Sequence, residues 1–215
     1  MNTKQAIVIA VDGPAASGKG TIARALAKHF RLAHMDTGLL YRAVALNLWR
    51  WGGDPSSEFE ALRATHDLGM DPDDEELRSE PVSKIASAIS AYPSVRTALL
   101  ERQQEFAGQP GGAVLDGRDI GTVIAPGADV KLFVTASPEV RAERRQKELI
   151  ARGMHVHIDD VLADILARDE RDSTREVAPL KQAPDALLLD TGDLSVEASI
   201  AEAIRLVEER LKTLR

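Results

Sequence analysis

The feature that most constrains this chain is a short apolar run followed at once by a glycine-rich loop and a lysine. Residues 6–11 read Ala-Ile-Val-Ile-Ala-Val, a β-rich run typical of a strand that is covered on both faces. Residues 13–19 then follow the pattern Gly-x-x-x-x-Gly-Lys, and residues 21–30 space apolar side chains four apart, as a helix does. A strand, a glycine loop and a helix in this order predict an anion-binding turn in an α/β sheet.

The residues of this loop suit the phosphate groups of a nucleotide. Glycines let backbone N–H groups turn toward an anion, and the start of the helix adds its positive end. Lys19 supplies a mobile cation for the β- and γ-phosphates. Gly20 stands where the usual pattern has a hydroxyl, which leaves Thr21 and Ser17 as candidate magnesium ligands. The alternative interpretation is a glycine-rich turn that carries a surface lysine.

Strand and helix patterns alternate along much of the remaining chain. Further apolar runs typical of strands lie at residues 32–35, 113–115, 130–134 and 186–189. Ser137-Pro138-Glu139 reads as an N-cap, a first-position proline and a first-turn acid, and residues 200–211 carry one apolar helix stripe. The alternation predicts a five-stranded parallel sheet flanked by helices, with ligands at the carboxyl ends of its strands.

Two regions depart from this alternation. Residues 37–112 hold long helical patterns without a convincing strand, and residues 141–175 are dense in charge. At 215 residues the chain is long enough for one domain. We therefore predict a single α/β domain, residues 1–215, with two excursions from its core. The core comprises residues 1–36, 109–140 and 173–215, and the excursions are about residues 37–108 and 141–172.

Composition excludes several classes of protein. The net charge of −7 argues against a non-specific nucleic-acid binder, and the absence of cysteine excludes disulfides, thiolate zinc sites and cysteine nucleophiles. No stretch approaches the roughly 18–20 apolar residues of a membrane span. Neither Asn2 nor Asn47 precedes a lysine, so the guanine-binding pattern of GTPases is missing. We expect a monomeric, cytoplasmic protein without nucleic-acid or membrane partners.

Arginines predict a second anion site. Arg42 lies one turn into the helix expected after the second strand, and Arg118 directly follows the strand at residues 113–115. A guanidinium group is a planar fork that matches phosphate oxygens. Arg42, Arg96 and Arg118 could therefore meet on one phosphate separate from the one beside Lys19. The alternative for each arginine is a surface ion pair.

Further basic residues fill the second excursion, where Arg141, Arg144 and Arg145 share one helix face. They are typical either of a solvated helix with ion pairs or of a lid that carries cations over a phosphate. Two anion sites and a cationic lid would suit phosphoryl transfer between two phosphorylated molecules. That reaction needs in-line positioning and charge neutralisation rather than a protein nucleophile.

Five elements together resemble the bacterial cytidylate kinases, a family of P-loop nucleoside monophosphate kinases. They are residues 13–21, 36–42, 92–96, 116–123 and 168–175. The resemblance implies transfer of a phosphoryl group from ATP to CMP or dCMP, with Mg²⁺, in pyrimidine nucleotide metabolism. It also implies that the two excursions are a helical monophosphate-binding insertion and a lid.

The resemblance assigns roles to individual residues. ATP would be held by Gly13, Pro14, Ala15, Ala16, Ser17, Gly18, Lys19, Gly20 and Thr21. Lys19, Arg118 and Arg175 would be catalytic. The acceptor nucleotide would be bound by Thr37, Tyr41, Arg42, Ser87, Arg96, Arg118, Asp119, Arg168, Asp172 and Arg175. Within that set, Arg42, Arg118 and Arg175 would hold its phosphate, Ser87, Arg96 and Asp119 would contact cytosine, and Arg168 and Asp172 the pentose. Thr21, Ser17 and Asp36 are the candidate magnesium ligands.

One departure from the family is visible. The family usually has a small strand-rich meander in the insertion, whereas residues 69–81 are short, acidic and without a β pattern. A truncated meander is therefore expected. The competing functions are another small-molecule P-loop kinase of the adenylate or shikimate type, an ATP-dependent switch, and an RNA-binding protein.

Overall fold

A computed structural model describes residues 6–66, 68–69 and 74–214 of the chain. The chain divides into two compact units. The first unit comprises Met1–Met35 and Ala107–Arg215, and the second comprises Asp36–Phe106. The roles of residues 37–108 as a monophosphate-binding insertion and of residues 141–172 as a lid stay predictions.

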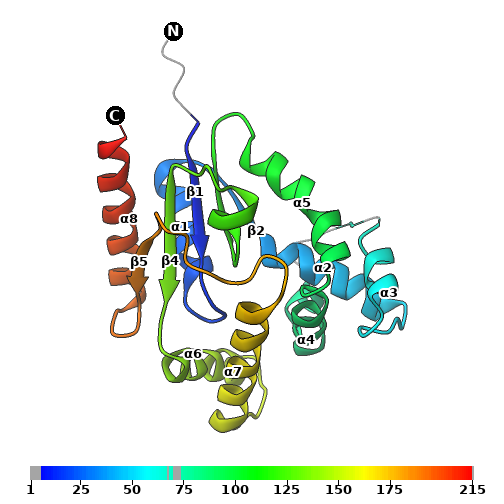
Figure 1. Ribbon diagram of the computed structural model, residues 1–215. Helices are drawn as coiled ribbons and strands as arrows, with labels where there is room; N and C mark the ends of the chain where they lie inside the picture. The colour runs from blue at the N-terminus through cyan, green and yellow to red at the C-terminus, as the bar shows by residue number, and fades with distance from the viewer. Residues whose placement is uncertain (1–5, 67, 70–73, 215) are drawn as a thin grey trace. The chain divides into compact units, whose positions relative to one another are not determined.

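The first unit is built on the predicted five-stranded parallel sheet, some of whose arrows lie side by side in Figure 1. Its strands are β1 (Val8–Asp12), β2 (Ala33–Asp36), β3 (Ala113–Gly117), β4 (Val130–Thr135) and β5 (Leu187–Asp190). Their order across the sheet is β2-β3-β1-β4-β5. All five apolar runs identified in the sequence therefore form strands. The central strand β1 and its neighbour β3 are almost wholly buried, which explains their unbroken apolar sequences.

Among its described residues, the first unit has four long helices, of which the first and the last pack against the sheet and the other two pack against each other. They are α1 (Lys19–Phe30), α6 (Pro138–Ala151), α7 (Ile158–Thr174) and α8 (Val196–Thr213), with a π-turn at Ile120–Ile124. Ile22 and Leu26 of α1 join Val207 of α8 in one core cluster with β1 and β4, as the apolar stripes predicted. Ser137 caps α6 through its hydroxyl, as expected. Helix α1 begins two residues before the predicted start because Gly18 serves as its N-cap.

The second unit is helical in its described part. It contains α2 (Thr37–Arg50), α3 (Glu58–Arg63), a 3₁₀ turn (Glu75–Arg78), α4 (Glu80–Ile89) and most of α5 (Pro93–Ala107). The described residues of 69–81 include that turn and no strand, while residues 70–73 lie outside the description. Trp49 and Trp51 lie at the end of α2 and are about half exposed. The Arg63 guanidinium lies 5.0 Å from the centre of the Trp51 ring.

Asp12 is a buried carboxylate at the end of β1. One of its oxygens accepts the N–H of Ile120 at 2.8 Å and the other accepts the N–H of Gly121 at 2.7 Å, so it ties β1 to the segment after β3. Burial raises the pKa of Asp12 from 3.8 to about 6, and the negative charge of Asp119 acts in the same direction. The two N–H groups and Lys19 oppose that rise in pKa without cancelling it.

The raised pKa of Asp12 predicts a pH-dependent stability difference. Because the folded state binds this proton more tightly than the unfolded state, ionisation of Asp12 lowers stability as the pH rises from about 4 to about 6. Asp12→Asn removes that loss. The free energy of unfolding of the variant minus that of the wild type should therefore rise by roughly 3 kcal/mol between pH 4 and pH 7. Urea unfolding at several pH values measures this difference, and a constant difference would contradict the raised pKa.

Candidate active site

The glycine loop between β1 and α1 has a backbone that few residues can adopt. Gly13 has φ of +155°, and a Cβ there would lie 2.0 Å from the carbonyl oxygen of Val134. Gly18 has φ of +86° at the N-cap of α1, and Ala16 also has a positive φ of 57°. The loop therefore passes against β4 at a distance that only glycine allows, and it ends at the start of a helix.

Ser17 is the loop residue whose side chain most clearly indicates that a ligand binds beside it. Its side chain is completely buried, and within the described part of the chain its Oγ has no hydrogen-bond partner. Buried hydroxyl groups in proteins are ordinarily hydrogen-bonded, so this oxygen fits a site that is completed by a bound group. Thr21 is different, because it is exposed and its Oγ1 accepts a hydrogen bond from Arg24 at 3.3 Å. The third metal candidate, Asp36, belongs to the second unit.

Asp116, near the carboxyl end of β3, is a carboxylate that our sequence reasoning did not select. His34 on β2 contacts its Oδ1 at 2.7 Å, and its Oδ2 lies 3.5 Å from the position that a Cβ of Gly20 would occupy. The carboxylate thus lies beside the first turn of α1. Its place at the end of a strand adjacent to β1 is the signal that could have identified it.

The described residues provide few side chains that could bind a metal ion together. No group of three or more His, Asp and Glu side chains is arranged to hold a metal ion there. Mg²⁺ is usually bound through substrate phosphates, water and one or two carboxylates rather than by a protein cage. The hydroxyl of Ser17 and the carboxylate of Asp116 each offer an oxygen ligand of the kind that this metal prefers.

Charged residues form a second cluster in the first unit, and it brings together five of the predicted substrate-binding residues. Arg118 Nε donates to Asp172 Oδ2 at 2.8 Å. Arg175 Nη2 lies 3.6 Å from Asp119 Oδ1, and its Nη1 lies 3.9 Å from Asp172 Oδ1. Arg168, one turn before Asp172 on α7, lies 4.0 Å from Asp172 Oδ2. Three arginines thus share two carboxylates.

The electrostatics of this cluster keep Asp172 ionised. Burial, the largest contribution, would raise its pKa. Arg118 acts against burial by its charge and its hydrogen bond, and Arg168 and Arg175 add their charges. Together they hold the pKa of Asp172 below its ordinary value of 3.8. The arginines are therefore fixed around a permanent negative charge.

The arginines of α6 do not form one cationic face. Arg141 is only 3 % exposed, pairs in bidentate fashion with Asp169 on α7, and donates to the carbonyl of Ala15 at 3.3 Å. Arg144 instead donates to Thr191. The interpretation as a solvated helix with ion pairs holds for Arg145 and Arg152, which both form ion pairs with Glu148. Neither sequence interpretation anticipated that Arg141 would bond to the glycine loop.

The second unit holds the other predicted substrate-binding residues. Arg42 on α2 donates to the carbonyl of Leu77 and to Ser83 Oγ, each at 3.0 Å. Arg96 on α5 is buried, and its guanidinium lies 5.6 Å from the centre of the Tyr41 ring. Two further predicted residues of this unit, Thr37 and Ser87, are also buried. The predicted convergence of Arg42 with Arg118 and Arg175 stays a prediction, because these residues belong to different units.

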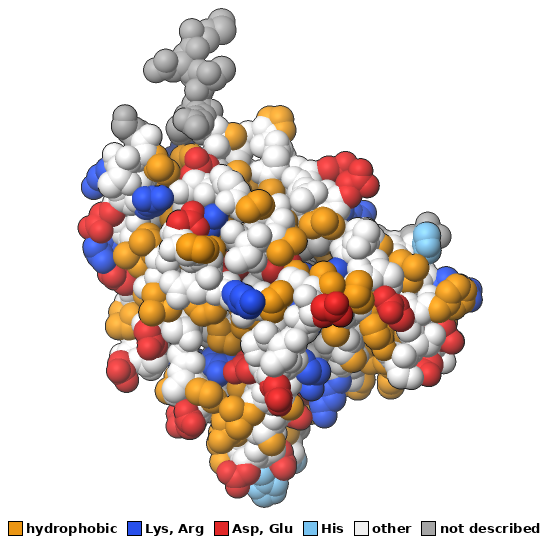
Figure 2. Space-filling view, in the orientation of Figure 1, with side chains coloured by type: hydrophobic (Ala, Val, Ile, Leu, Met, Phe, Trp, Pro, Cys, Tyr) orange, Lys and Arg blue, Asp and Glu red, His pale blue; other side chains and the backbone are white. Residues whose placement is uncertain are grey.

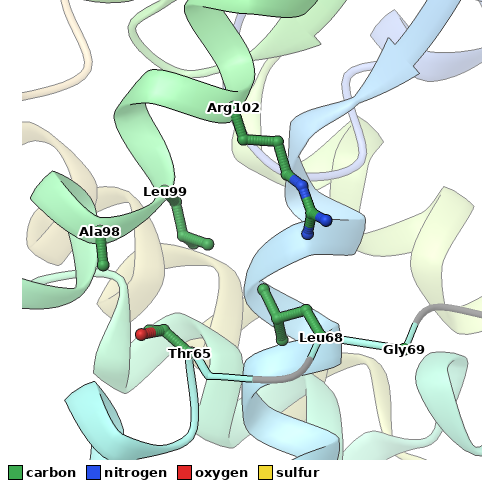
Figure 3. Close-up of a pocket in the computed structure, with 6 residues that line it drawn as sticks. All are labelled: Thr65, Leu68, Gly69, Ala98, Leu99 and Arg102. Atoms are coloured by element: carbon green, nitrogen blue, oxygen red, sulfur yellow. The ribbon is translucent and has the colours of Figure 1, made fainter.

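A pocket of about 510 Å³ also lies in the second unit (Figure 3). It is lined by Thr65, Leu68, Gly69, Ala98, Leu99 and Arg102. Among the described residues that line it, none is a predicted site residue, and Arg102 is the one charged group. The described lining thus offers a single cation, and we do not assign this pocket to the reaction.

On the face in Figure 2, acidic and basic side chains are interspersed among the described residues. Among the described helices, none is both long enough and apolar enough to cross a bilayer.

Solved structures share the architecture of this chain. A gluconokinase of Sinorhizobium meliloti superposes with a TM-score of 0.54 over 97% of this chain and 95% of its own, at 16% identity. A protein of Eubacterium ventriosum gives a TM-score of 0.58 at 14% identity, over 95% of this chain and 99% of its own. At these identities the likeness concerns the fold alone.

Sequence relatives are far more similar. The family described as cytidylate kinase matches residues 9–209. The cytidylate kinase of Xanthobacter autotrophicus is 57% identical over 206 residues, which cover 95% of this chain and 98% of the relative. That of Methylocella silvestris is 55% identical over 97% of both chains. The chain therefore belongs to the cytidylate kinase family.

Proposed function

We propose that this protein transfers the γ-phosphoryl group of ATP to CMP and dCMP, giving CDP and dCDP. The observation that carries the proposal is the family match across residues 9–209, within which the glycine loop and the arginine cluster of Arg118, Arg168 and Arg175 both occur. Adenylate- and shikimate-type kinases are not favoured, because the named relatives at 53–57% identity are cytidylate kinases. A monomeric, cytoplasmic enzyme remains our expectation from the sequence.

On the donor side, residues 13–21 hold the phosphates of ATP. Backbone N–H groups of the loop and the N-terminus of α1 face the phosphate oxygens. The Lys19 ammonium group stabilises the negative charge that develops on the phosphoryl group during transfer. Lys19 Nζ donates to the carbonyl of Pro14 at 3.1 Å, so its side chain is folded back over the loop. Mg²⁺ would neutralise charge on the reacting phosphates, and Ser17 and Asp116 would hold it.

On the acceptor side, Arg118 and Arg175 hold the phosphate of CMP. Two unit anions 4 Å apart repel by roughly 4 kcal/mol at an effective dielectric constant of 20, so the attacking phosphate needs fixed cations nearby. The carboxylates of Asp172 and Asp119 already orient these guanidinium groups. Binding of the phosphate then costs little side-chain ordering.

The nucleoside would be recognised by the residues that the family resemblance assigns to it. Asp119, Ser87 and Arg96 supply an acceptor, a hydroxyl and a donor that complement the amino group, carbonyl and ring nitrogen of cytosine. Tyr41 packs against Arg96 and steadies its guanidinium. Asp172 and Arg168 contact the pentose. The remaining acceptor-binding residues of the second unit are Arg42, Thr37 and Tyr41.

Turnover across a panel of acceptors tests the proposed function. We expect efficient ADP formation with CMP and dCMP, and much slower reaction with UMP, AMP, GMP and shikimate. A coupled assay with ATP and Mg²⁺ measures each rate. A clear preference for AMP or shikimate, or slow ATP hydrolysis that no nucleoside monophosphate stimulates, would overturn the assignment.

Lys19→Met should lower kcat by roughly 10²–10³-fold, because the ammonium group acts on charge that develops in the transition state. Lys28→Met removes an exposed lysine from the last turn of the same helix and is the matched control. Steady-state kinetics compare the two variants. Near-normal turnover of Lys19→Met would remove the central role given to this lysine.

Arg118→Ala should raise the KM for CMP by roughly 10- to 100-fold, because a charge-assisted hydrogen bond is worth about 1.5–3 kcal/mol. The KM for ATP should change little. Arg118→Lys keeps the positive charge but loses the planar guanidinium that can donate two parallel hydrogen bonds, and it should give an intermediate KM for CMP. Arg205→Ala, on the exposed face of α8, is the control. Equal increases in both KM values would contradict the placement of Arg118 on the acceptor side.

A further inference from the structure

Thr191 follows directly after β5 and is completely buried. Its Oγ1 lies 3.0 Å from the carbonyl oxygen of Ser17, a residue 174 positions earlier in the chain, and 3.0 Å from that of Thr135. The carbonyl of Thr135 already accepts the N–H of Thr191 at 2.8 Å. A side chain with no predicted role therefore reaches the backbone of the glycine loop.

Arg144 on α6 fixes Thr191 from the other side. Its Nη1 donates to Thr191 Oγ1 at 2.9 Å, and its Nη2 donates to the carbonyl of Thr191 at 2.6 Å. Because a guanidinium group can only donate, the Thr191 hydroxyl accepts from Arg144 and its single proton points to a carbonyl. The carbonyls of Ser17 and Thr135 lie at the same distance from this hydroxyl, and the Thr135 carbonyl already accepts the N–H of Thr191. The Ser17 carbonyl is therefore the acceptor to which we assign the hydroxyl proton.

This contact controls the next N–H group of the loop. A trans peptide is planar, with its C=O and N–H on opposite sides, and the described peptides include no cis bond. When Thr191 holds the carbonyl of Ser17, the N–H of Gly18 must point away from Thr191. Gly18 has wide conformational freedom and caps α1 with φ of +86°, so its peptide would otherwise rotate easily.

Two neighbouring peptides are held in the same way. The carbonyl of Pro14 accepts from Lys19 Nζ at 3.1 Å, and the carbonyl of Ala15 accepts from Arg141 Nη1 at 3.3 Å. Side chains from α1, α6 and the end of β5 thus donate hydrogen bonds to carbonyls of the loop. In each of these peptides, the N–H group of the following residue points to the side opposite the bonded carbonyl. Donors aimed in advance at an anion bind it without a reorganisation cost.

We propose that Thr191, held by Arg144, is a positioning residue for the phosphoryl donor. It acts through the Ser17 carbonyl by directing the Gly18 N–H toward the phosphates, without touching ATP itself. The proposal rests on the proposed function, since it requires that residues 13–21 bind the phosphates of ATP.

A matched pair of variants separates the hydroxyl from the rest of the side chain. Thr191→Val keeps the shape and loses the hydroxyl, whereas Thr191→Ser keeps the hydroxyl and loses a methyl group. Thr191→Val should raise the KM for ATP roughly 5- to 10-fold, with kcat and the KM for CMP within about twofold of wild type. Thr191→Ser should restore the KM for ATP. Calorimetric titration with inorganic pyrophosphate should show the same weakening for Thr191→Val as titration with ATP.

Three results would overturn the proposal. They are an unchanged KM for ATP in Thr191→Val, weaker binding of ATP but not of pyrophosphate, and failure of Thr191→Ser to rescue. The second result would mean that Thr191 contacts the nucleoside, and the third that only packing matters. A wild-type enzyme that binds ATP and pyrophosphate but does not phosphorylate CMP would refute the proposed function instead, and leave the Thr191 comparison intact.

Arg144→Met supplies an independent check. It should raise the KM for ATP in the same direction, and its effect should not add to that of Thr191→Val, because both changes release the same hydroxyl. Arg205→Met on α8 removes an exposed arginine and should leave the KM for ATP unchanged. Additive effects of Arg144→Met and Thr191→Val would show that Arg144 does not act through Thr191, contrary to the proposal.

Discussion

The backbone of the glycine loop is the constraint on which the rest of the first unit depends. A loop that directs its N–H groups to a polyanion cannot satisfy its own carbonyls, and it uses positive φ angles that are unfavourable for most residues. Buried neighbours therefore have to hold it. Strand β4 packs directly against Gly13, and side chains from α1, α6 and the end of β5 donate hydrogen bonds to the loop carbonyls. The parallel sheet brings these distant segments to one edge.

The arginine cluster solves a different electrostatic problem. Guanidinium groups gathered without anions would repel one another, and a buried carboxylate without cations would be strongly destabilising. Asp172 and Asp119 offset two of the three positive charges of Arg118, Arg168 and Arg175, which lowers the repulsion among the guanidinium groups. Under the proposed function, the phosphate of the acceptor would meet cations that are already in place.

Local patterns were sufficient to predict the sheet and the start of α6, because apolar periodicity and Ser137 capping act within a few residues. Helix α1 was placed two residues late because Gly18 caps it without a side chain. The residues of the arginine cluster came from motif resemblance. Sequence reasoning missed Thr191, Asp116 and the burial of Arg141, since their partners lie 28 to 174 positions away. The sequence pattern around an arginine that donates a hydrogen bond to a buried carbonyl is the same as that around an arginine on a surface helix.

The position of the two tryptophans has a practical consequence. Trp49 and Trp51 are the only tryptophans of the sequence, and both belong to the second unit at the end of α2. Intrinsic indole emission is therefore a local reporter of that unit, whereas far-ultraviolet dichroism averages over all helices of the chain. Recording both signals during one denaturation would distinguish loss of the second unit from loss of the nucleotide-binding sheet, without any added label.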